Sequence, residues 1–421
     1  MPRRPTPELY PRPRALPKSL RRSAVPAWLF ALLAAAFVLY TDDYVIAGVL
    51  PEIARDLDVT EAHAGQLVTV FSLTVALAAP IAGVALARVS RRYLFTAAFV
   101  VFIAANLVAA TTNSFGLLVM LRIVAALAAA ASTPAVFAFA AERAPQGHIG
   151  RYVAVVALGV TGSIAAGVPV GTWLGGHHGW RATFVAMAVG GIAALVFLLV
   201  TLPRESDNTG EVPSVREQLR TLTSAPVSLG LLANCALMTG SMMMLTYMAP
   251  YLAEVSKASV DQRALAFSLS GFAGILCIWA GGKATDRWGP DRALVTGIGI
   301  FTGIMAVMGL LWFVRPVPFS VLVVMGTIWG GMAFWNSPAI QARLYLLAGP
   351  VAAQALALNT SSTYLGVSLG GAVGGLTLGS AGAGLLPAVA AVLGLSALGL
   401  LALAIGASRK SPTGADALAP H

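Results

Sequence analysis

The chain has 421 residues, of which 57% are hydrophobic and only 10% are charged, and its formal net charge is +10. Soluble proteins carry about 25% charged residues, so this composition excludes a soluble multidomain enzyme, and the high hydrophobicity excludes a disordered chain. The basic residues are scattered between apolar runs, which argues against nucleic-acid binding. The sequence therefore predicts an all-α polytopic membrane protein.

Residues 1–24 are polar and basic, and we expect a cytoplasmic tail that leads into the first membrane span. A run of about 20 apolar residues is needed to cross a bilayer. Twelve such runs follow, over 25–50, 64–87, 93–112, 115–141, 152–176, 181–202, 226–253, 262–284, 293–314, 317–342, 351–378 and 383–407. The polar stretch 203–225 separates them six and six. We thus predict six-helix bundles over 25–202 and 226–407, a cytoplasmic central loop over 203–225, and a cytoplasmic C-terminal tail over 408–421.

Lys and Arg residues set the predicted orientation. With the N-terminus inside, the tails and inner loops hold 21 of these residues and the outer loops hold 5. Inner loops of membrane proteins are enriched in Lys and Arg. Arginine also outnumbers lysine 23 to 4, which is typical of a GC-rich bacterial genome. We therefore predict a multi-pass protein of the bacterial inner (cytoplasmic) membrane with both termini cytoplasmic.

The two halves share landmarks at a constant offset of 199 residues. Three regions keep this register: Gly83 and Arg88 match Gly282 and Arg287, Pro51 matches Pro250, and Gly167, Gly171, Gly175 and Gly176 match Gly366, Gly370, Gly374 and Gly375. Parallel duplication of six-helix halves is typical of secondary transporters, whose substrate site lies between the halves.

Several motifs add to this repeat. They read TDDYVIAGVLPEIARDL, GVALARVSRR, LLVMLRIVAAL, GVPVGTWLGG followed by GWRATF, TYMAPYL, GGKATDRWGPDR and LNTSSTYLGVSLGGAVGG. With these motifs the chain resembles the major facilitator superfamily over nearly all its length. The similarity is closest to bacterial twelve-helix drug:proton antiporters of the arabinose-efflux-like and chloramphenicol-exporter-like kind. The resemblance implies the major facilitator fold, with two pseudo-symmetric six-helix bundles.

The same resemblance implies gating or structural roles for two motifs. In the family, the loop after the second span helps to close the cytoplasmic side, and the span-5 glycine motif of drug exporters is associated with limiting proton leak. The matching residues here are Gly83, Arg88, Arg91, Arg92, Gly282, Asp286, Arg287 and Gly289 in the loops, and Gly167, Pro169, Gly171 and Gly175 in span 5. The first loop departs from the family pattern, with Ala87 at the Asp position and Ser90 at a Gly position. Because small residues allow close helix approach, we expect the span-5 glycines to pack against the glycine face of span 11.

Three ionisable residues lie well inside apolar spans. A charge at mid-membrane costs about 2.5–3.5 kcal/mol on insertion scales, so such residues usually face a cavity or each other. Asp43 and Arg122 lie at similar depths, about 12 Å and 10 Å from the outer ends of spans 1 and 4 at 1.5 Å per residue. We predict that Asp43 is the main proton-coupling carboxylate and that Arg122 is its counter-charge. Asp42 is either a second cavity acid or a structural partner, and all three also admit a purely structural role.

Candidate substrate contacts are aromatic, Met and amide residues of the spans expected to line a central cavity. Such side chains give large, adaptable contact areas, although no spacing separates any one of them from ordinary core residues. The candidates are Tyr44, Phe137, Met243, Tyr247, Trp329, Trp335, Asn336 and Tyr364.

Motifs for catalysis or cofactors are not evident. The sequence has no Gly-x-x-x-x-Gly-Lys-Ser/Thr phosphate-binding loop and no hydrolase motif. Its two cysteines fall in apolar spans and its histidines in predicted loops or the tail, so we expect no metal site, no cofactor and no enzymatic activity.

We therefore predict a monomeric, proton-coupled transporter that exports a small amphipathic, drug-like molecule by alternating access. Its predicted partners are the substrate, protons and the lipid bilayer. Export of a sugar or other metabolite, and uptake or uncoupled facilitation, remain open from the sequence. A membrane-embedded enzyme or sensor is the remote alternative.

Overall fold

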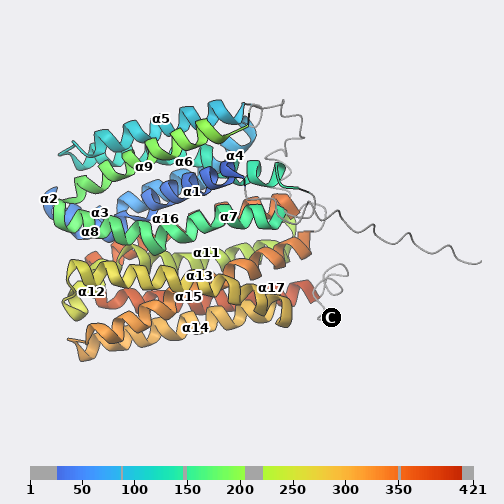
Figure 1. Cartoon of the computed structure of the whole chain (residues 1–421). Helices are drawn as coiled ribbons and strands as arrows, with labels where there is room; N and C mark the ends of the chain where they lie inside the picture. Colours follow the sequence, from blue (N-terminus) through green and yellow to red (C-terminus); the bar gives the residue numbers. More distant parts are fainter. Residues whose placement is uncertain (1–25, 87–88, 146–148, 204–220, 349–351, 410–421) are drawn as a thin grey trace, which may run out of the picture.

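Helices make up almost all of the described part of the chain in the computed structural model (Figure 1). The structure describes residues 26–86, 89–145, 149–203, 221–348 and 352–409, so the two predicted tails and most of the central loop lie outside it. The α-helices of the first half are α1 (Ala27–Tyr44), α2 (Ile46–Asp56), α3 (Glu61–Ala64), α4 (Gln66–Ala85), α5 (Arg91–Ala109), α6 (Phe115–Glu142), α7 (Ile149–Gly162), α8 (Val168–His178) and α9 (Trp180–Thr201). Those of the second half are α11 (Ala225–Thr246), α12 (Met248–Ser256), α13 (Val260–Trp288), α14 (Pro290–Leu311), α15 (Phe319–Ala348), α16 (Ala352–Ala381) and α17 (Leu386–Arg409).

Eleven segments of the described chain are long and apolar enough to cross a membrane. They match eleven of the twelve predicted spans. The remaining predicted span, over 351–378, corresponds to α16, which has 30 residues but is rich in Gly, Ser and Thr. Because α16 packs against α11 of its own half and α4 of the other half, its Gly, Ser and Thr residues do not all have to face lipid. The protein is thus an all-helical, multi-span membrane protein.

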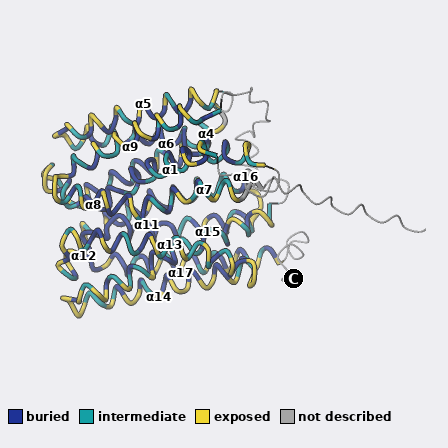
Figure 2. Tube along the Cα trace, in the orientation of Figure 1, coloured by how far each residue is buried: buried dark blue, intermediate teal, exposed yellow. Residues whose placement is uncertain are grey.

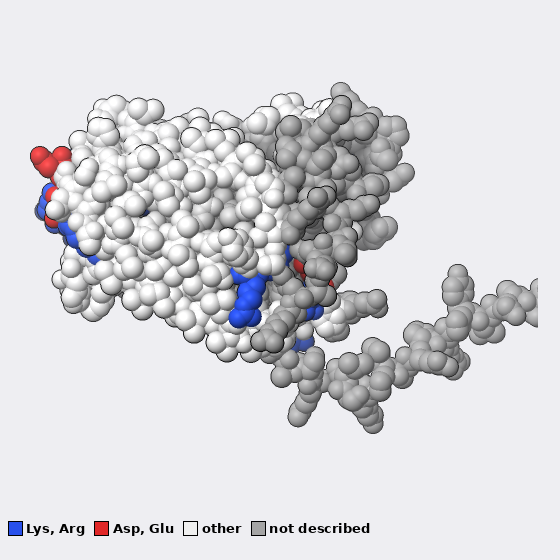
Figure 3. Space-filling view, turned by 90° about the horizontal axis from the view of Figure 1, so that it is seen from above, with Lys and Arg blue, Asp and Glu red and all other residues white. Residues whose placement is uncertain are grey.

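The spans run roughly parallel in two groups (Figure 1). Helices α5, α9 and α1 lie on one side, α13, α15 and α14 on the other, and α7, α16 and α11 between them. Buried positions concentrate along the inner faces of the helices (Figure 2). The surface in Figure 3 is mostly uncharged across its middle, and charged side chains gather toward its two ends. We call the end that carries α2, α3 and α12 the outer end, following the predicted orientation, and the opposite end the inner end.

Glycines set the packing of helices within each half. A Cβ added at Gly167 would collide with Thr41 of α1, and one at Gly171 would collide with Val45. In the second half, Gly366 and Gly370 approach the backbone of α11 in the same way. Our expectation that the span-5 glycines pack against the span-11 glycines was therefore wrong, because each half uses its own copy of the motif for its own internal contact.

Neighbouring glycines join the two halves instead. A Cβ at Gly176 would strike Val260 of α13, and one at Gly371 of α16 would strike Thr69 of α4. Gly271 similarly meets the backbone at Ala165. The glycine-rich segments therefore serve two faces, one toward the helix partner in the same half and one toward the other half.

The departure at Ser90 has a local explanation. In the second half, Gly289 starts α14 with φ 81° and ψ 158°, a conformation that is essentially limited to glycine. The matching residue Ser90 has φ −57°, and its hydroxyl accepts a hydrogen bond from the Tyr93 N–H at the start of α5. The first half thus starts this helix with a serine cap and does not need a glycine there.

Gly289→Ala should destabilise the protein by about 1–3 kcal/mol, because alanine must adopt a backbone conformation that disfavours a Cβ. Ser90→Gly should cost only a few tenths of a kcal/mol, as glycine is an adequate cap. Thermal unfolding of the two purified variants in the same detergent compares them. Equal losses would show that the two helix starts are equivalent.

Candidate functional site

A buried ion pair joins α1 and α6. Arg122 Nη1 donates to Asp42 Oδ2 at 2.7 Å, and Nη2 donates to the Asp42 carbonyl oxygen at 2.9 Å. Both side chains are at most 1% exposed, and the guanidinium lies 4.2 Å above the Phe71 ring centroid. We predicted Arg122 as the counter-charge of Asp43, but the direct ion pair of Arg122 is with Asp42. Adjacent helix residues point about 100° apart, and only Asp42 faces α6.

Asp43 is buried without a hydrogen-bond partner. It is 1% exposed, and neither carboxylate oxygen accepts a hydrogen bond from any described residue. Three tyrosines surround it closely enough to interact electrostatically: Tyr40 and Tyr44 from α1 and Tyr364 from α16. Tyr364 also shares a hydrogen bond with Tyr40. Asp43 therefore lies where the two halves of the protein meet.

A small cavity borders this carboxylate. Its volume is about 10 Å³, enough for about one water molecule. Its lining comes from both halves and consists of Asp43, Tyr44, Ala47, Val68, Met242, Leu245, Thr246 and Val367. In this state the cavity is too small for an organic substrate.

The arrangement of charges decides what this site can do. The Asp42–Arg122 pair is neutral as a unit, so ionised Asp43 leaves the site with one uncompensated negative charge. A buried charge without a partner is costly, and such groups neutralise or bind a counter-ion. The site can therefore take up one positive charge, either as a proton on Asp43 or as a small cation in place of the water molecule.

The two halves are linked at the outer end by one ion pair and one longer polar contact. Arg263 of α13 donates to Glu52 of α2 at 2.7 Å, and these side chains are 8% and 13% exposed. His177 of α8 approaches Asp261 of α13 at 3.7 Å. Nearer the middle, Gly65 packs against the Tyr247 ring. These contacts close the outer side in this state.

The outer end of the first half has its own polar clamp. Asp56 at the end of α2 accepts hydrogen bonds from Arg181 and from Trp180 Nε1, the latter at 3.0 Å. Arg181 also donates to the Thr112 carbonyl oxygen at 2.9 Å. The hydrogen bond from Arg181, followed by that from Trp180, holds the pKa of Asp56 below its usual value. The clamp ties α2 to α9 and to the turn before α6.

The loop motifs take different partners in the two halves. Arg91 pairs with Glu142 at the inner end of α6 at 3.1 Å, whereas Asp291 accepts from Arg343 at the inner end of α15 at 2.8 Å. One ion pair thus joins the start of α5 to the end of α6, and the other joins the start of α14 to the end of α15, with the acidic and basic residues exchanged. Of the remaining predicted residues, Arg88 lies outside the described residues, and Arg92, Asp286 and Arg287 are exposed.

Four other motif positions differ in how far packing explains them. A Cβ added at Gly83 or Gly282 would meet nothing within 4 Å, so packing does not require these glycines. Pro169 is buried at the start of α8, directly after a π-helical turn over Ser163–Gly167. Gly175 packs against Val49 of α2.

Four of the eight predicted substrate contacts lie either beside Asp43 or in the core of the second half. Tyr44 and Tyr364 lie beside Asp43. Met243 and Tyr247 are fully buried in the core of the second half, where the Tyr247 hydroxyl donates to the Gly371 carbonyl oxygen at 2.8 Å. Only the first pair is therefore placed at the charged centre.

The remaining four candidates pack elsewhere. Trp335 Nε1 donates to the Ala293 carbonyl oxygen of α14 at 3.0 Å, and Asn336 bonds within its own helix. Trp329 is 2% exposed, and Phe137 is half-buried against the core of the first half. The structure thus places Trp335 and Asn336 between α15 and α14 instead of beside Asp43.

Sequence reasoning missed Tyr40, Met242 and Thr246. Tyr40 is three residues before Asp43, a spacing that puts both side chains on one helix face, and this signal was available. Met242 and Thr246 lie on α11 and line the cavity beside Asp43. Nothing in their spacing singled them out.

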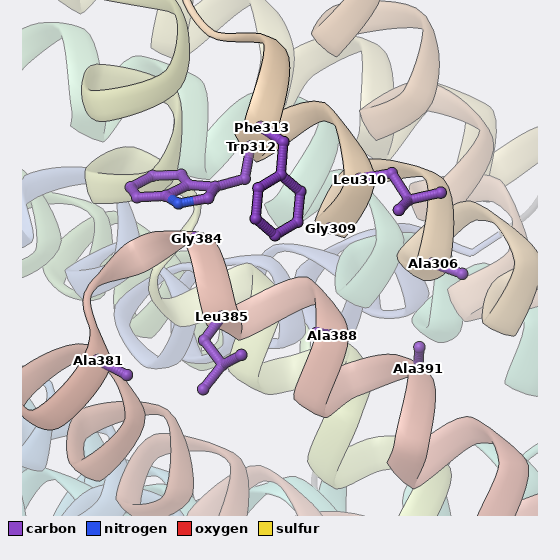
Figure 4. Close-up of a pocket in the computed structure, with 10 residues that line it drawn as sticks. All are labelled: Ala306, Gly309, Leu310, Trp312, Phe313, Ala381, Gly384, Leu385, Ala388 and Ala391. Atoms are coloured by element: carbon purple, nitrogen blue, oxygen red, sulfur yellow. The ribbon is translucent and has the colours of Figure 1, made fainter.

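A larger cavity lies away from this centre (Figure 4). It measures about 470 Å³ and opens between the outer ends of α14 and α17, with an apolar lining. Neither helix contributes to the space beside Asp43. Within the described ranges, no group of three His, Cys, Asp or Glu residues gathers as metal ligands would.

Comparison with known proteins gives the family. The model of the Major Facilitator Superfamily matches residues 32–350. The chain belongs to this superfamily. It is therefore a secondary membrane transporter and not an enzyme.

Relatives within the superfamily agree along most of the chain. The inner membrane transport protein YdhP of Escherichia coli K12 is 30% identical over 91% of this chain and 96% of its own length. The uncharacterized MFS-type transporter YbcL of Bacillus subtilis is 30% identical over 83% of this chain and 88% of its own. A chloramphenicol resistance protein of Streptomyces lividans is 30% identical over 84% of this chain and 90% of its own.

Solved transporters share the fold at low identity. A D-xylose–proton symporter superposes with a TM-score of 0.72 at 16% identity, covering 89% of this chain and 96% of its own. A bacterial homologue of the lysosomal transporter Spinster, in an inward-facing and occupied conformation, gives 0.68 at 18% identity, covering 93% and 98%. The major facilitator fold expected from the sequence is confirmed.

Removing the partner of Asp42 and removing the charge of Asp43 should have opposite effects on stability. Arg122→Gln leaves Asp42 as a buried unpaired charge and should destabilise the protein by about 3–5 kcal/mol. Asp43→Asn removes a charge that has no partner and should leave stability unchanged or higher. Thermal unfolding in detergent measures both, and Asp42→Asn combined with Arg122→Gln should recover part of the loss. A larger loss for Asp43→Asn than for Arg122→Gln would contradict the observed pairing.

Proposed function

We propose that this transporter exports a small amphipathic, drug-like molecule in exchange for protons. The proposal depends above all on Asp43, the one buried carboxylate of the described residues that sits unpaired between the two halves. Its charge must be neutralised before the surrounding helices can close around it. The likeness to a chloramphenicol resistance protein supports a drug-like substrate.

In this scheme Asp43 couples the inward movement of protons to the outward movement of the substrate. With the outer end closed by Glu52 and Arg263, exchange at Asp43 in the present state takes place from the inner end. Release of the proton toward the cytoplasm exposes one negative charge and favours substrate binding. Opening toward the outside then requires the outer ion pair to break, and protonation from outside returns the carrier.

In this scheme the Asp42–Arg122 pair positions the part of α1 that carries Asp43. It fixes α1 against α6 and keeps a positive charge near Asp43, which interacts electrostatically with Arg122. Tyr44 and Tyr364 are the predicted substrate contacts best placed to meet a ligand at this carboxylate. Met243, Tyr247 and Trp329 were also predicted as substrate contacts, and because all three are buried we propose that they support the helix packing instead.

We further propose that the protein resides in the bacterial inner membrane as a monomer, with both termini cytoplasmic and six spans in each half. The distribution of Lys and Arg supports this orientation. The relative from Escherichia coli named an inner membrane transport protein supports the location.

Asp43→Asn should abolish proton-driven export, because an amide cannot carry the proton. The measurement compares wild type and variant in everted membrane vesicles energised by a pH gradient, with a panel of phenicols and cationic dyes, at matched protein levels. Asp43→Glu serves as the control and should retain coupling. Gradient-driven transport by Asp43→Asn at the wild-type rate would refute the role of Asp43. A well-expressed wild type that moves sugars or other metabolites and none of the panel would favour the metabolite-exporter alternative.

Arg263→Gln should loosen the outer closure, because it removes the cation that holds Glu52. In a variant whose two native cysteines are replaced by serine, we would introduce Thr246→Cys beside Asp43 and label it with a membrane-impermeant thiol reagent from outside. Labelling should accelerate about tenfold with Arg263→Gln and remain unchanged with Arg55→Gln, which alters an exposed outer arginine. Equal labelling in all backgrounds would show that this ion pair does not close the outer side.

A further inference from the structure

A second groove follows the contact between α14 and α17, at the inner end. It has a volume of about 390 Å³ and is lined by Trp288, Asp291, Arg292, Val295, Thr296, Ile405 and Arg409. Its position is remote from Asp43, and none of its residues takes part in the coupling scheme. Neither the comparisons nor the proposed transport function gives this groove a role.

The charges at its mouth are strongly positive. Arg292 comes from the first turn of α14 and Arg409 from the last residue of α17, and within the described ranges neither guanidinium forms an ion pair or hydrogen bond. The carboxylate of Asp291 accepts instead from buried Arg343 at 2.8 Å. The four charges therefore sum to two positive charges, which are open to an anionic ligand.

The two helix ends at this groove offset each other. The N-terminus of α14 favours negative charge, but Asp291 already lies in its first turn, and the C-terminus of α17 at Arg409 has the opposite dipole end. The preference for an anion therefore depends on the side chains of Arg292 and Arg409.

The groove changes from polar to apolar along the helix axis. Val295 lies one turn deeper than Arg292, and Ile405 lies one turn deeper than Arg409. Trp288 is 42% exposed at the edge, as an aromatic side chain at a membrane interface often is. A phosphate at the arginines would therefore be followed by a hydrocarbon chain along the apolar part.

We propose that this inner groove binds an anionic phospholipid of the cytoplasmic leaflet, with the phosphate held by Arg292 and Arg409. Basic pockets between spans on the cytoplasmic side are suited to such headgroups. Both helices belong to the second half, so the bound lipid moves with that half. The assignment to the cytoplasmic leaflet depends on the predicted orientation.

The outer cavity between the same helices provides an internal comparison. Arg315, beside this cavity, stacks on the lining residue Trp312 with its guanidinium 3.7 Å from the ring centroid. The rest of its lining is apolar (Figure 4). Arg315 is therefore the matched control, an exposed arginine at the opposite end of the same helix pair.

The test is native mass spectrometry of the full-length protein in micelles that contain equal amounts of phosphatidylglycerol and phosphatidylcholine. The wild type should retain phosphatidylglycerol about tenfold over phosphatidylcholine. The double variant Arg292→Gln, Arg409→Gln should lose this preference, the double Lys variant should keep most of it, and Arg315→Gln should match the wild type. Retained preference in the double Gln variant, or an equal loss in Arg315→Gln, would overturn the proposal.

Two further measurements keep the outcome decisive. A phospholipid with a photoactivatable acyl chain should crosslink to peptides from the start of α14 and the end of α17, and labelling confined to other segments would count against the site. Inorganic phosphate at the same phosphate concentration should not displace the lipid, and displacement would indicate a free-anion site. If the double Gln variant fails to fold, each single Gln variant should show a partial loss that the corresponding Lys variant does not.

Discussion

The cost of placing charge inside a bilayer governs this structure. Asp42 and Arg122 meet at 2.7 Å with almost no exposure, and together they introduce no net charge into the membrane. Asp43, the next residue, has neither a cation in contact nor a hydrogen-bond donor. Two chemically identical side chains therefore behave differently because α1 turns them toward different neighbours. One has a guanidinium partner at hydrogen-bond distance, and the other has no hydrogen-bond partner among the described residues.

Duplication determines how this centre is enclosed. Each half uses glycines of its fifth span to bring that span against its first, as Gly171 does at Val45 and Gly370 does at α11. Residues beside those glycines, Gly176 and Gly371, contact the opposite half. The same segments therefore contribute both to the packing within each half and to the packing between the halves, where α4 lies against α16 and α8 against α13.

The sequence predicted the architecture because length and hydropathy of spans are local properties. It also located Asp42, Asp43 and Arg122 as the ionisable residues within the spans. It failed where direction around a helix mattered: an apolar span gives little periodicity, so the choice between Asp42 and Asp43 for Arg122 required the neighbouring helix. Trp335 failed for the same reason, since its indole faces α14. Ser90 was judged as a departure from a motif, although its hydroxyl performs locally what a glycine conformation performs at Gly289.

Among the described residues, ion pairs within one half and ion pairs between the halves serve different purposes. At the outer end, Glu52 and Arg263 come from opposite halves, so their attraction is lost whenever the halves separate there. At the inner end, Arg91–Glu142 and Asp291–Arg343 each lie within one half and persist through such a movement. The inner pairs therefore hold helices of one half together, whereas the Glu52–Arg263 pair holds the two halves together. Its side chains are 8% and 13% exposed, against 41% and 70% for His177 and Asp261, so water screens this pair less than the other contact.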